Sequence, residues 1–238
     1  MPESFERTIV GDVVAADFRT ARIFEQFGID FCCGGRRSIA DACLEASADP
    51  VALKSALDAL ADDDRQDVSQ WPVEQLIKHI VTAHHAYIRA HVPTIERHLD
   101  RIVHVHGQRH PELAEIAATF DHVARDLQQH MLKEERMLFP YIAELAAHPG
   151  DTPIASPFGS VENPIRVMER EHRAAGDEMQ RIRELTHGYL PPPDACGTYR
   201  TAFAELAAFD DDLHRHVHLE NNVLFPQAVT LEQRACGA

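Results

Sequence analysis

Two stretches of the sequence decide its fold: HMLKEERMLFP at residues 130–140 and HVHLENNVLFP at residues 216–226. They align without a gap at an offset of 86 residues, and each contains a His-x-x-x-Glu motif followed by Leu-Phe-Pro. Residues i and i+4 lie above one another on the same face of an α-helix. Each stretch is therefore predicted to be a helix that turns one histidine and one glutamate inward, with the Leu-Phe-Pro residues packing beside them.

A further histidine precedes each stretch at a similar distance. His172 lies 44 residues before His216, and His85 lies 45 residues before His130. If Val73-Glu74 is instead aligned without a gap with Val161-Glu162, His84 matches His172, so the duplication itself leaves two candidates in the first half. One position along a helix corresponds to about 100° of rotation, so only one of these neighbours can face the interior.

The repeated histidines and glutamates predict a metal site. A single His-x-x-x-Glu on a helix is more often an exposed pair, but two copies with the same tail and a matched upstream histidine are a much stronger indication. Two such halves facing each other supply four imidazoles and two carboxylates, more than the four ligands that zinc prefers. These six groups fit two irons held inside a helical bundle, with the glutamates bridging them.

The remaining histidines are expected to lie mostly on the surface or to support the site from outside. They are His79, His84, His91, His98, His104, His106, His110, His122, His148, His187, His214 and His218. Glu135 and Glu171 adjoin candidate ligands but point about 100° away from them on their helices. We expect these two glutamates to support a ligand or to line a channel.

Four long helical patterns predict an all-α fold. They cover residues 71–104, 112–147, 164–187 and 197–231, whereas alternating strand patterns and hairpin dipeptides are almost absent. Helices of about 25–35 residues would be ~40–50 Å long at 1.5 Å per residue, which suits a four-helix bundle.

A polar, acidic stretch at residues 61–71 predicts a linker. It divides the chain into a small helical N-terminal domain, residues 1–62, and the bundle, residues 70–238. In the first domain Gly28 is expected to stop a helix, and Ser38 followed by Asp41 resembles a capping signal.

The Cys32-Cys33-Gly34-Gly35 segment predicts a turn that carries two adjacent thiols. Such a pair could accept a nitrosyl group, bind one iron transiently or cycle as a disulfide, but it cannot hold a whole cluster, which usually needs four protein ligands. Cys32 and Cys33 are therefore the candidates for thiol chemistry. The other cysteines, Cys43, Cys196 and Cys236, are expected to be bystanders.

Composition limits the partners and the compartment. A net charge of −15 argues against nucleic acid and anionic lipid as partners. No run approaches the 18 or so apolar residues of a membrane span, and the first residues lack the pattern of a secretory signal. Five cysteines, an odd number, do not indicate a disulfide framework, so we expect reduced thiols in the cytoplasm.

These motifs resemble the RIC family (repair of iron centres, of the YtfE/ScdA type), whose main domain is hemerythrin-like. The resemblance covers nearly the whole chain and rests on DFCCGG at 30–35, HMLKEE at 130–135 with LFP at 138–140, VMEREH at 167–172 and LENNVLFP at 219–226. In the family pattern the first ligand lies eight residues before the proline of a Val-Pro or Leu-Pro pair. Pro93 therefore selects His85 over His84.

The resemblance implies a hemerythrin-like four-helix bundle preceded by a small helical domain, as a monomer or homodimer. It also implies two non-haem irons per chain, oxo- or hydroxo-bridged, with six ligands: His85, His130, Glu134, His172, His216 and Glu220. Oxygen-carrying hemerythrins use five histidines with an aspartate and a glutamate, and the fifth histidine has no evident counterpart here. Fewer imidazoles leave the irons more open, which suits exchange chemistry better than oxygen carriage.

The function that the resemblance implies is the repair of iron–sulfur clusters damaged by nitrosative or oxidative stress, by iron donation, by nitric oxide removal or by both. Damaged iron–sulfur proteins would be the partners, and nitric oxide or O2 the small-molecule ligands. The alternative is a cytoplasmic protein that binds or reduces nitric oxide without a repair role, so whether the chain is an enzyme stays open. The Cys32–Cys33 pair favours repair, since a bundle that only binds gas does not need it.

Overall fold

The computed structural model describes residues 5–60, 67–148 and 156–236. In chain order its elements are α2 (Val10–Ala16), η1 (Phe18–Thr20), α3 (Ala21–Gln26), α4 (Ile39–Ala46), α5 (Pro50–Asp58), α6 (Val73–His79), η3 (Ile80–His85), α7 (Ala86–His106), α8 (Glu112–Lys133), η4 (Glu134–Leu138), α9 (Phe139–Ala147), α10 (Glu162–Leu185), α11 (Gly197–His218), η5 (Leu219–Leu224) and α12 (Phe225–Cys236). η1 is a 3-10 helix, and η3, η4 and η5 are π-helical segments. The all-α prediction is confirmed.

The four predicted long helices correspond to runs of these elements. The first comprises α6, η3 and α7, the second α8, η4 and α9, the third α10 alone, and the fourth α11, η5 and α12. The fourth continues to Cys236 rather than ending near Leu231. The π-helical segments were not predicted, because hydrophobic spacing does not distinguish one π turn from a continuing α-helix.

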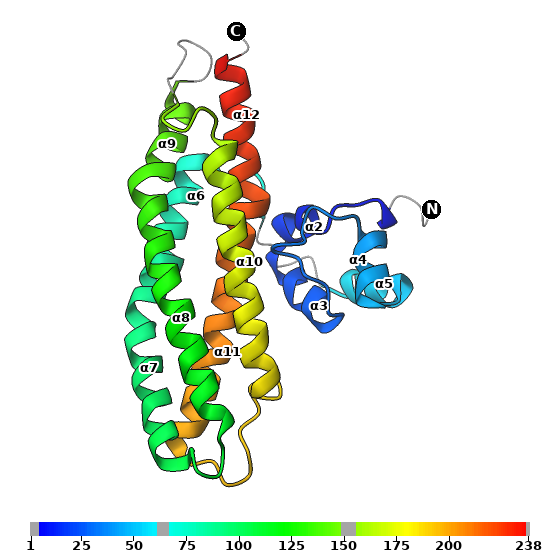
Figure 1. Cartoon of the computed structure of the whole chain (residues 1–238). Coiled ribbons are helices and arrows are strands. Elements are labelled where there is room, and N and C mark those ends of the chain that lie inside the picture. The colour runs from blue at the N-terminus through cyan, green and yellow to red at the C-terminus, as the bar shows by residue number, and fades with distance from the viewer. Residues whose placement is uncertain (1–4, 61–66, 149–155, 237–238) are drawn as a thin grey trace. The chain divides into compact units, whose positions relative to one another are not determined.

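The chain divides into two compact units, which we describe separately. The first, residues 77–144 and 156–214, contains long helices that run side by side (Figure 1). Their interior is built from residues at helical spacing, such as Ile95, Leu99 and Ile102 of α7. Phe120 of α8 meets Phe209 of α11 edge-on, with 5.1 Å between the ring centroids.

A buried carboxylate ties the turn after α10 to α11. Asp210, of which 1% is exposed, accepts a hydrogen bond of 2.6 Å from the Arg183 guanidinium and one of 2.7 Å from the Tyr189 hydroxyl. Burial and the nearby carboxylate raise the pKa of Tyr189 well above its ordinary value. Tyr189 has a φ of 62°, a left-handed conformation that these bonds help to hold.

The second unit comprises residues 1–76, 145–155 and 215–238. In its N-terminal part Asp17 adopts an extended backbone and caps η1, and this separates α2 from α3. The Ser38 side chain caps α4 by accepting from the Asp41 amide, as predicted. Ser47, with a φ of 53°, ends α4, and Pro50 is the first residue of α5, a position that suits proline.

The predicted boundary between the two domains stays a prediction. Residues 61–66 of the predicted linker lie outside the described residues. Within the second unit, α2 packs against η5, so the N-terminal helices contact the part of the chain that follows His214.

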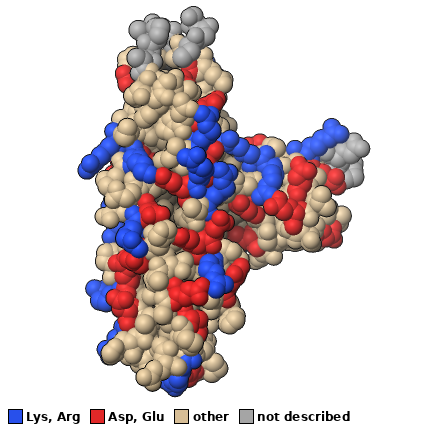
Figure 2. Space-filling view, in the orientation of Figure 1, with Lys and Arg blue, Asp and Glu red and all other residues tan. Residues whose placement is uncertain are grey.

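Charged side chains of both signs are interspersed on the face shown in Figure 2, and acidic ones are found along its length. This agrees with the net charge of −15. Over the described residues, none of the helices combines the length and the hydropathy needed to cross a bilayer.

Candidate metal centre

The six candidate ligands come from four helical runs and are all buried, with at most 1% of each residue exposed. They are His85 at the end of η3, His130 in α8, Glu134 at the start of η4, His172 in α10, His216 in α11 and Glu220 in η5. Three of the six therefore lie in π-helical segments. Such segments occur mostly as single turns inside α-helices and are frequent at functional sites.

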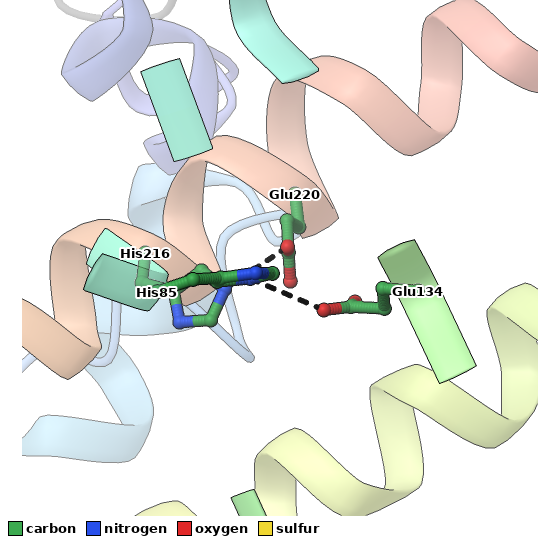
Figure 3. Close-up of side chains that lie close together, drawn as sticks. All are labelled: His85, Glu134, His216 and Glu220. Carbon is green, nitrogen blue, oxygen red and sulfur yellow. Dashed lines mark hydrogen bonds and ion pairs between the residues drawn. The ribbon is translucent and has the colours of Figure 1, made fainter. Parts of the chain in front are cut away.

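These side chains form two groups that could each hold a metal ion. The first group consists of His85, Glu134, His216 and Glu220 (Figure 3), and the second of His130, Glu134, His172 and Glu220. Within each group, one ligand atom from every residue lies within 4.8 Å of those of the others. Glu134 and Glu220 belong to both groups, whereas each histidine belongs to one.

The predicted pairing of i and i+4 residues is observed in both stretches. Nε2 of His130 lies 3.1 Å from Oε1 of Glu134, and Nε2 of His216 lies 3.0 Å from Oε1 of Glu220. The second oxygen of Glu134, Oε2, lies 3.4 Å from Nε2 of His85. The two oxygens of Glu134 thus face histidines that belong to different groups.

Aromatic packing fixes one of the imidazoles. The Phe139 ring, from the first Leu-Phe-Pro, stacks on the His85 ring with 5.9 Å between centroids and 18° between planes. Leu224 and Phe225 of the second Leu-Phe-Pro are fully buried. The expectation that these residues pack beside the site is confirmed for Phe139.

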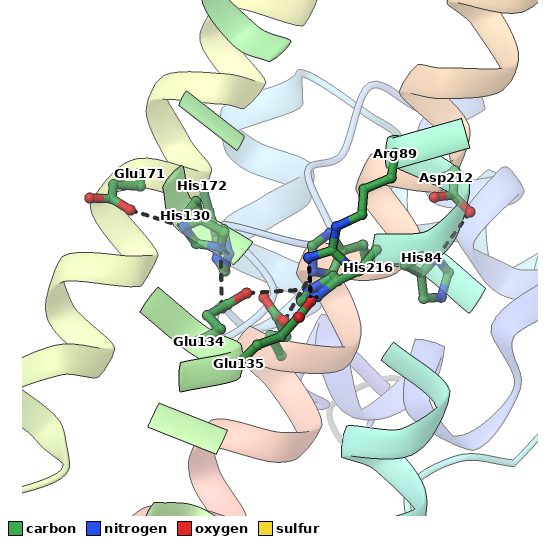
Figure 4. A network of polar contacts seen from close by, with 11 residues as sticks. His84, Arg89, His130, Glu134, Glu135, Glu171, His172, Asp212 and His216 are labelled. Carbon is green, nitrogen blue, oxygen red and sulfur yellow. Dashed lines mark hydrogen bonds and ion pairs between the residues drawn. The ribbon is translucent and has the colours of Figure 1, made fainter. Parts of the chain in front are cut away.

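Two carboxylates outside the groups contact Nδ1 of candidate ligand histidines, the ring nitrogen other than the Nε2 that faces the group (Figure 4). Oε1 of Glu135 lies 2.6 Å from Nδ1 of His85, and Oε2 of Glu171 lies 3.0 Å from Nδ1 of His130. When Nδ1 donates its proton to a carboxylate, the lone pair is left on Nε2, the atom that faces the group. The sequence predicted a supporting role for these glutamates but not that each reaches a histidine of another helix.

The charge of these carboxylates is stabilised by their partners. The hydrogen bond with His130 lowers the pKa of Glu171 to about 2, against the effect of partial burial and with the help of Lys133. Partial burial raises the pKa of Glu135, but hydrogen bonds with His85 and Arg89 outweigh it, so the pKa lies below its ordinary value. Both side chains are therefore ionised at neutral pH. Each can accept an Nδ1–H.

The two candidates left open by the duplication are now distinguished by position. His85 belongs to the first group, whereas Nδ1 of His84 lies 2.9 Å from Oδ1 of Asp212, a residue outside both groups (Figure 4). Of the other histidines, which were expected to lie mostly on the surface or to support the site from outside, His84, His106 and His218 are buried. Buried histidines that pair with other polar groups have the same spacing on a helix as metal ligands.

A groove reaches one candidate ligand from outside. It lies between α8 and α10, has a volume of about 160 Å³, and is lined among others by His130, Lys133, Glu171 and Glu178. Glu171 was expected to support a ligand or to line a channel, and its side chain is part of the wall of this groove.

Cys32 and Cys33 belong to neither group and lie in the predicted turn of the N-terminal region. Both are free thiols, Cys32 buried and Cys33 half-buried. Cys43 is buried and Cys196 is exposed.

Comparison with known families agrees with this geometry. A family model described as Hemerythrin HHE cation binding domain matches residues 76–228, more than half of the chain and a range that contains all six candidate ligands. The chain belongs to the hemerythrin family. A second model, ScdA_N, described as Domain of Unknown function (DUF542), matches residues 6–61.

Curated relatives of this hemerythrin-family chain share both parts. The "Iron-sulfur cluster repair protein YtfE" of Yersinia pestis (strain Pestoides F) is 34% identical over 222 residues, which cover 92% of this chain and 96% of the relative. The proteins of the same name from Yersinia pseudotuberculosis serotype O:1b (strain IP 31758) and serotype IB (strain PB1/+) are 34% and 33% identical over the same shares. The chain is therefore of the YtfE type, as the sequence motifs indicated.

Proposed function

We propose that the two groups hold two non-haem irons, one each, with Glu134 and Glu220 shared between them. The support is that both glutamates belong to both groups, while the four histidines are divided two and two. A carboxylate can give one oxygen to each of two ions. Six ligands distributed in this way suit a pair of irons better than a single tetrahedral zinc.

The residues present fit such a centre. Two carboxylates with no exposed surface are costly to bury unless opposite charge compensates them, and bound cations would supply it. Imidazole and carboxylate are ligands that suit iron. Glu135 and Glu171 would hold His85 and His130 in the tautomer whose Nε2 can bind a cation.

We further propose that the chain repairs iron–sulfur clusters damaged by nitrosative or oxidative stress, in the cytoplasm. The observation that carries this proposal is that one chain contains both a hemerythrin domain and an N-terminal Cys-Cys turn. Over 92% of its length, the chain is similar to a protein named for iron–sulfur cluster repair. When bound, the irons would supply ions for donation and sites that bind nitric oxide.

The chain's own residues would control release and delivery. Neutral imidazoles bind iron less tightly as they become protonated, so iron held by four histidines is easier to give up than iron in an all-thiolate site. The groove lined by His130 and Glu171 is where an exchanging ion or a small molecule would approach this ligand. Cys32 and Cys33, which lie outside the metal groups, are the thiols that would meet a damaged client.

Two measurements test the proposal. First, the metal content and Mössbauer spectrum of the purified protein should give about two coupled irons per chain, as expected from the two groups. Glu134→Ala and Glu220→Ala should each lower the iron content or uncouple the irons, whereas Glu74→Ala, at an exposed position, should change neither. A single tetrahedral zinc, or unchanged iron in both variants, would overturn the metal assignment.

Second, the iron-loaded protein is incubated with an iron–sulfur protein that nitric oxide has inactivated, without added iron. We expect the client's activity to return and the iron content of this chain to fall. If the chain binds or consumes nitric oxide but the client stays inactive, the alternative function without repair is supported instead.

A further inference from the structure

Asn222 holds the turn that carries the two thiols. Its side-chain amide Nδ2 donates to the backbone oxygen of Cys32 at 2.9 Å and to that of Phe31 at 3.2 Å. Asn222 lies in η5, two residues after Glu220, so one short segment carries both a candidate ligand and the support of the Cys-Cys turn. The Arg36 guanidinium adds a contact of 3.5 Å to the backbone oxygen of Asn221.

Two glycines make room for this side chain. A Cβ on Gly11 would lie 2.9 Å from the Asn222 side chain, and a Cβ on Gly35 would lie 2.6 Å from its Oδ1. The two glycines are themselves joined by a backbone hydrogen bond of 2.7 Å. The N-terminal backbone therefore approaches Asn222 more closely than any other residue type would allow.

Rings complete the contact on the other side of the turn. The His218 ring lies 5.8 Å from that of Phe31 and 5.9 Å from that of Phe18, measured between centroids. Burial lowers the pKa of His218 to about 4, so the ring is neutral at neutral pH, and its Nδ1 lies 3.2 Å from the amide Nδ2 of Asn222. The turn is thus held by two hydrogen bonds and by aromatic packing.

The two thiols are left in different surroundings. Cys32 is only 7% exposed, whereas Cys33 is half-buried. Oδ1 of Asp30 accepts from both backbone amides of the pair and lies 3.2 Å from Sγ of Cys32. A hydrogen bond with Cys33, together with burial, raises the pKa of the Cys32 thiol well above its ordinary value.

The first copy of the duplication lacks this arrangement. Arg136 stands where Asn222 stands in the second copy, and Leu132 stands in place of His218. Arg136 is exposed. Since both copies keep the His-x-x-x-Glu and Leu-Phe-Pro residues, the metal site does not require Asn222, and its contacts with the thiol turn are what distinguish it.

We propose that Asn222 is a positioning residue that holds the turn so that Cys33 is the reactive thiol and Cys32 is sequestered. Cys33 would then be the first group of the pair to meet an electrophile, a metal ion or a client. The inference adds to the proposed function by assigning order to the thiols. Its readout is thiol reactivity, so a failed repair assay would leave it standing.

The test is alkylation of the purified, iron-loaded chain with iodoacetamide, sampled over time and mapped by fragment mass spectrometry. In this reaction the cysteine sulfur displaces iodide from carbon, and the thiol proton passes to the buffer. We expect Cys33 to react about tenfold faster than Cys32 or more, because reaction of Cys32 first requires the two bonds from Asn222 to break. Exposed Cys196 and buried Cys43 serve as internal references.

Asn222→Ala should raise the Cys32 rate about tenfold and reduce the preference for Cys33, because the two hydrogen bonds are lost. Arg136→Ala, the matched position in the first copy, should leave the preference unchanged. Iron content and Tm are recorded for each variant, so a general loss of structure is recognised by faster alkylation of Cys43 as well.

A second variant reaches the same contact from the opposite side. Gly11 lies within helical backbone of α2, where alanine is favoured, and its added methyl would displace the Asn222 side chain. Gly11→Ala should therefore reproduce the effect of Asn222→Ala. The proposal is overturned if Cys32 reacts as fast as Cys33 in the unmodified chain, or if both folded variants leave Cys32 as protected as before.

Discussion

Oε1 of Glu135 lies 2.6 Å from Nδ1 of His85, although the two residues are 50 positions apart in the sequence. Glu135 directly follows a candidate ligand on its own helix and holds a candidate ligand of another. Glu171 has the same relationship to His130, and it directly precedes His172. Each of these carboxylates therefore links two helices at the level of the metal groups and fixes which nitrogen of an imidazole faces inward.

Replacing the Glu135 carboxylate should weaken metal binding. In Glu135→Gln the side chain keeps its size but loses its charge, so the His85 ring is less firmly oriented and less basic. We expect the affinity for iron to fall about 10–100-fold, as measured by competition with a chromogenic chelator. Glu74→Gln, at an exposed position of α6, is the control, and equal affinities for the two variants would contradict the role of Glu135.

The thiols should be separable from the metal. Cys32→Ala combined with Cys33→Ala is expected to keep both irons and their spectrum, because neither cysteine belongs to the metal groups, yet to lose most repair activity. The measurement is recovery of a nitric-oxide-damaged cluster protein alongside iron content. The control is Cys196→Ala, which removes an exposed thiol elsewhere. Repair at the unmodified rate by the double variant would make the pair spectators.

Removing the N-terminal region should affect stability more than metal binding. A chain that begins at Ser69 is expected to stay helical and keep its iron, because no candidate ligand precedes His85. Its Tm should fall, because Phe18 and Phe31 would no longer pack on the His218 ring. Circular dichroism and iron analysis check both points. Loss of the iron would mean that the first 68 residues belong to the core of the bundle.

The Asp210 carboxylate of α11, which pairs with Arg183 of α10, should stabilise the fold. Asp210→Ala leaves the Arg183 guanidinium and the Tyr189 hydroxyl without this acceptor. The expected loss is about 2 kcal/mol in the free energy of unfolding, below the range for fully buried pairs because the Arg183 side chain is 34% exposed. Urea denaturation measures it, with Asp211→Ala as the exposed control. Equal midpoints for the two variants would contradict this assignment.

The alkylation of Cys32 should depend on pH in the way that its raised pKa requires. Because the pKa of Cys32 is raised, little of it is thiolate at neutral pH, and its reactive form increases only as the pH rises past the ordinary value of about 9. We therefore expect the rate at Cys32 to keep increasing as the pH rises beyond that value. A rate at Cys32 that levels off below that pH would contradict the raised pKa.

Sequence spacing was sufficient for the parts of the site that lie on one helix. The pairing of His130 with Glu134, and of His216 with Glu220, follows from the geometry of i and i+4 residues. The choice between His84 and His85 did not follow from the duplication, since one residue of register separates them. That choice depended on the family resemblance, and in the structure His85 lies in the first metal group, with Glu134 and Glu220.

Side-chain contacts between different helices could not be predicted from the spacing of residues along the sequence. Glu135 and Glu171 appear on the sequence as neighbours of ligands, but their partners lie on other helices, and only the packing of the bundle brings them together. The same holds for His218 and Asn222, whose contacts are with the N-terminal turn. The π-helical segments were missed because the local sequence carries no period that marks them.

The two duplicated stretches, residues 130–140 and 216–226, differ in what they contact besides the metal groups. In the second stretch His218 and Asn222 contact the turn that carries the thiols, whereas Arg136, which stands in place of Asn222 in the first stretch, is exposed. A chimaera with residues 130–140 in both positions would retain the His-x-x-x-Glu motifs. It would lack the His218 and Asn222 side chains that hold the turn with Cys32 and Cys33. The first stretch therefore supplies candidate metal ligands, and the second supplies both candidate ligands and the side chains that hold the turn with Cys32 and Cys33.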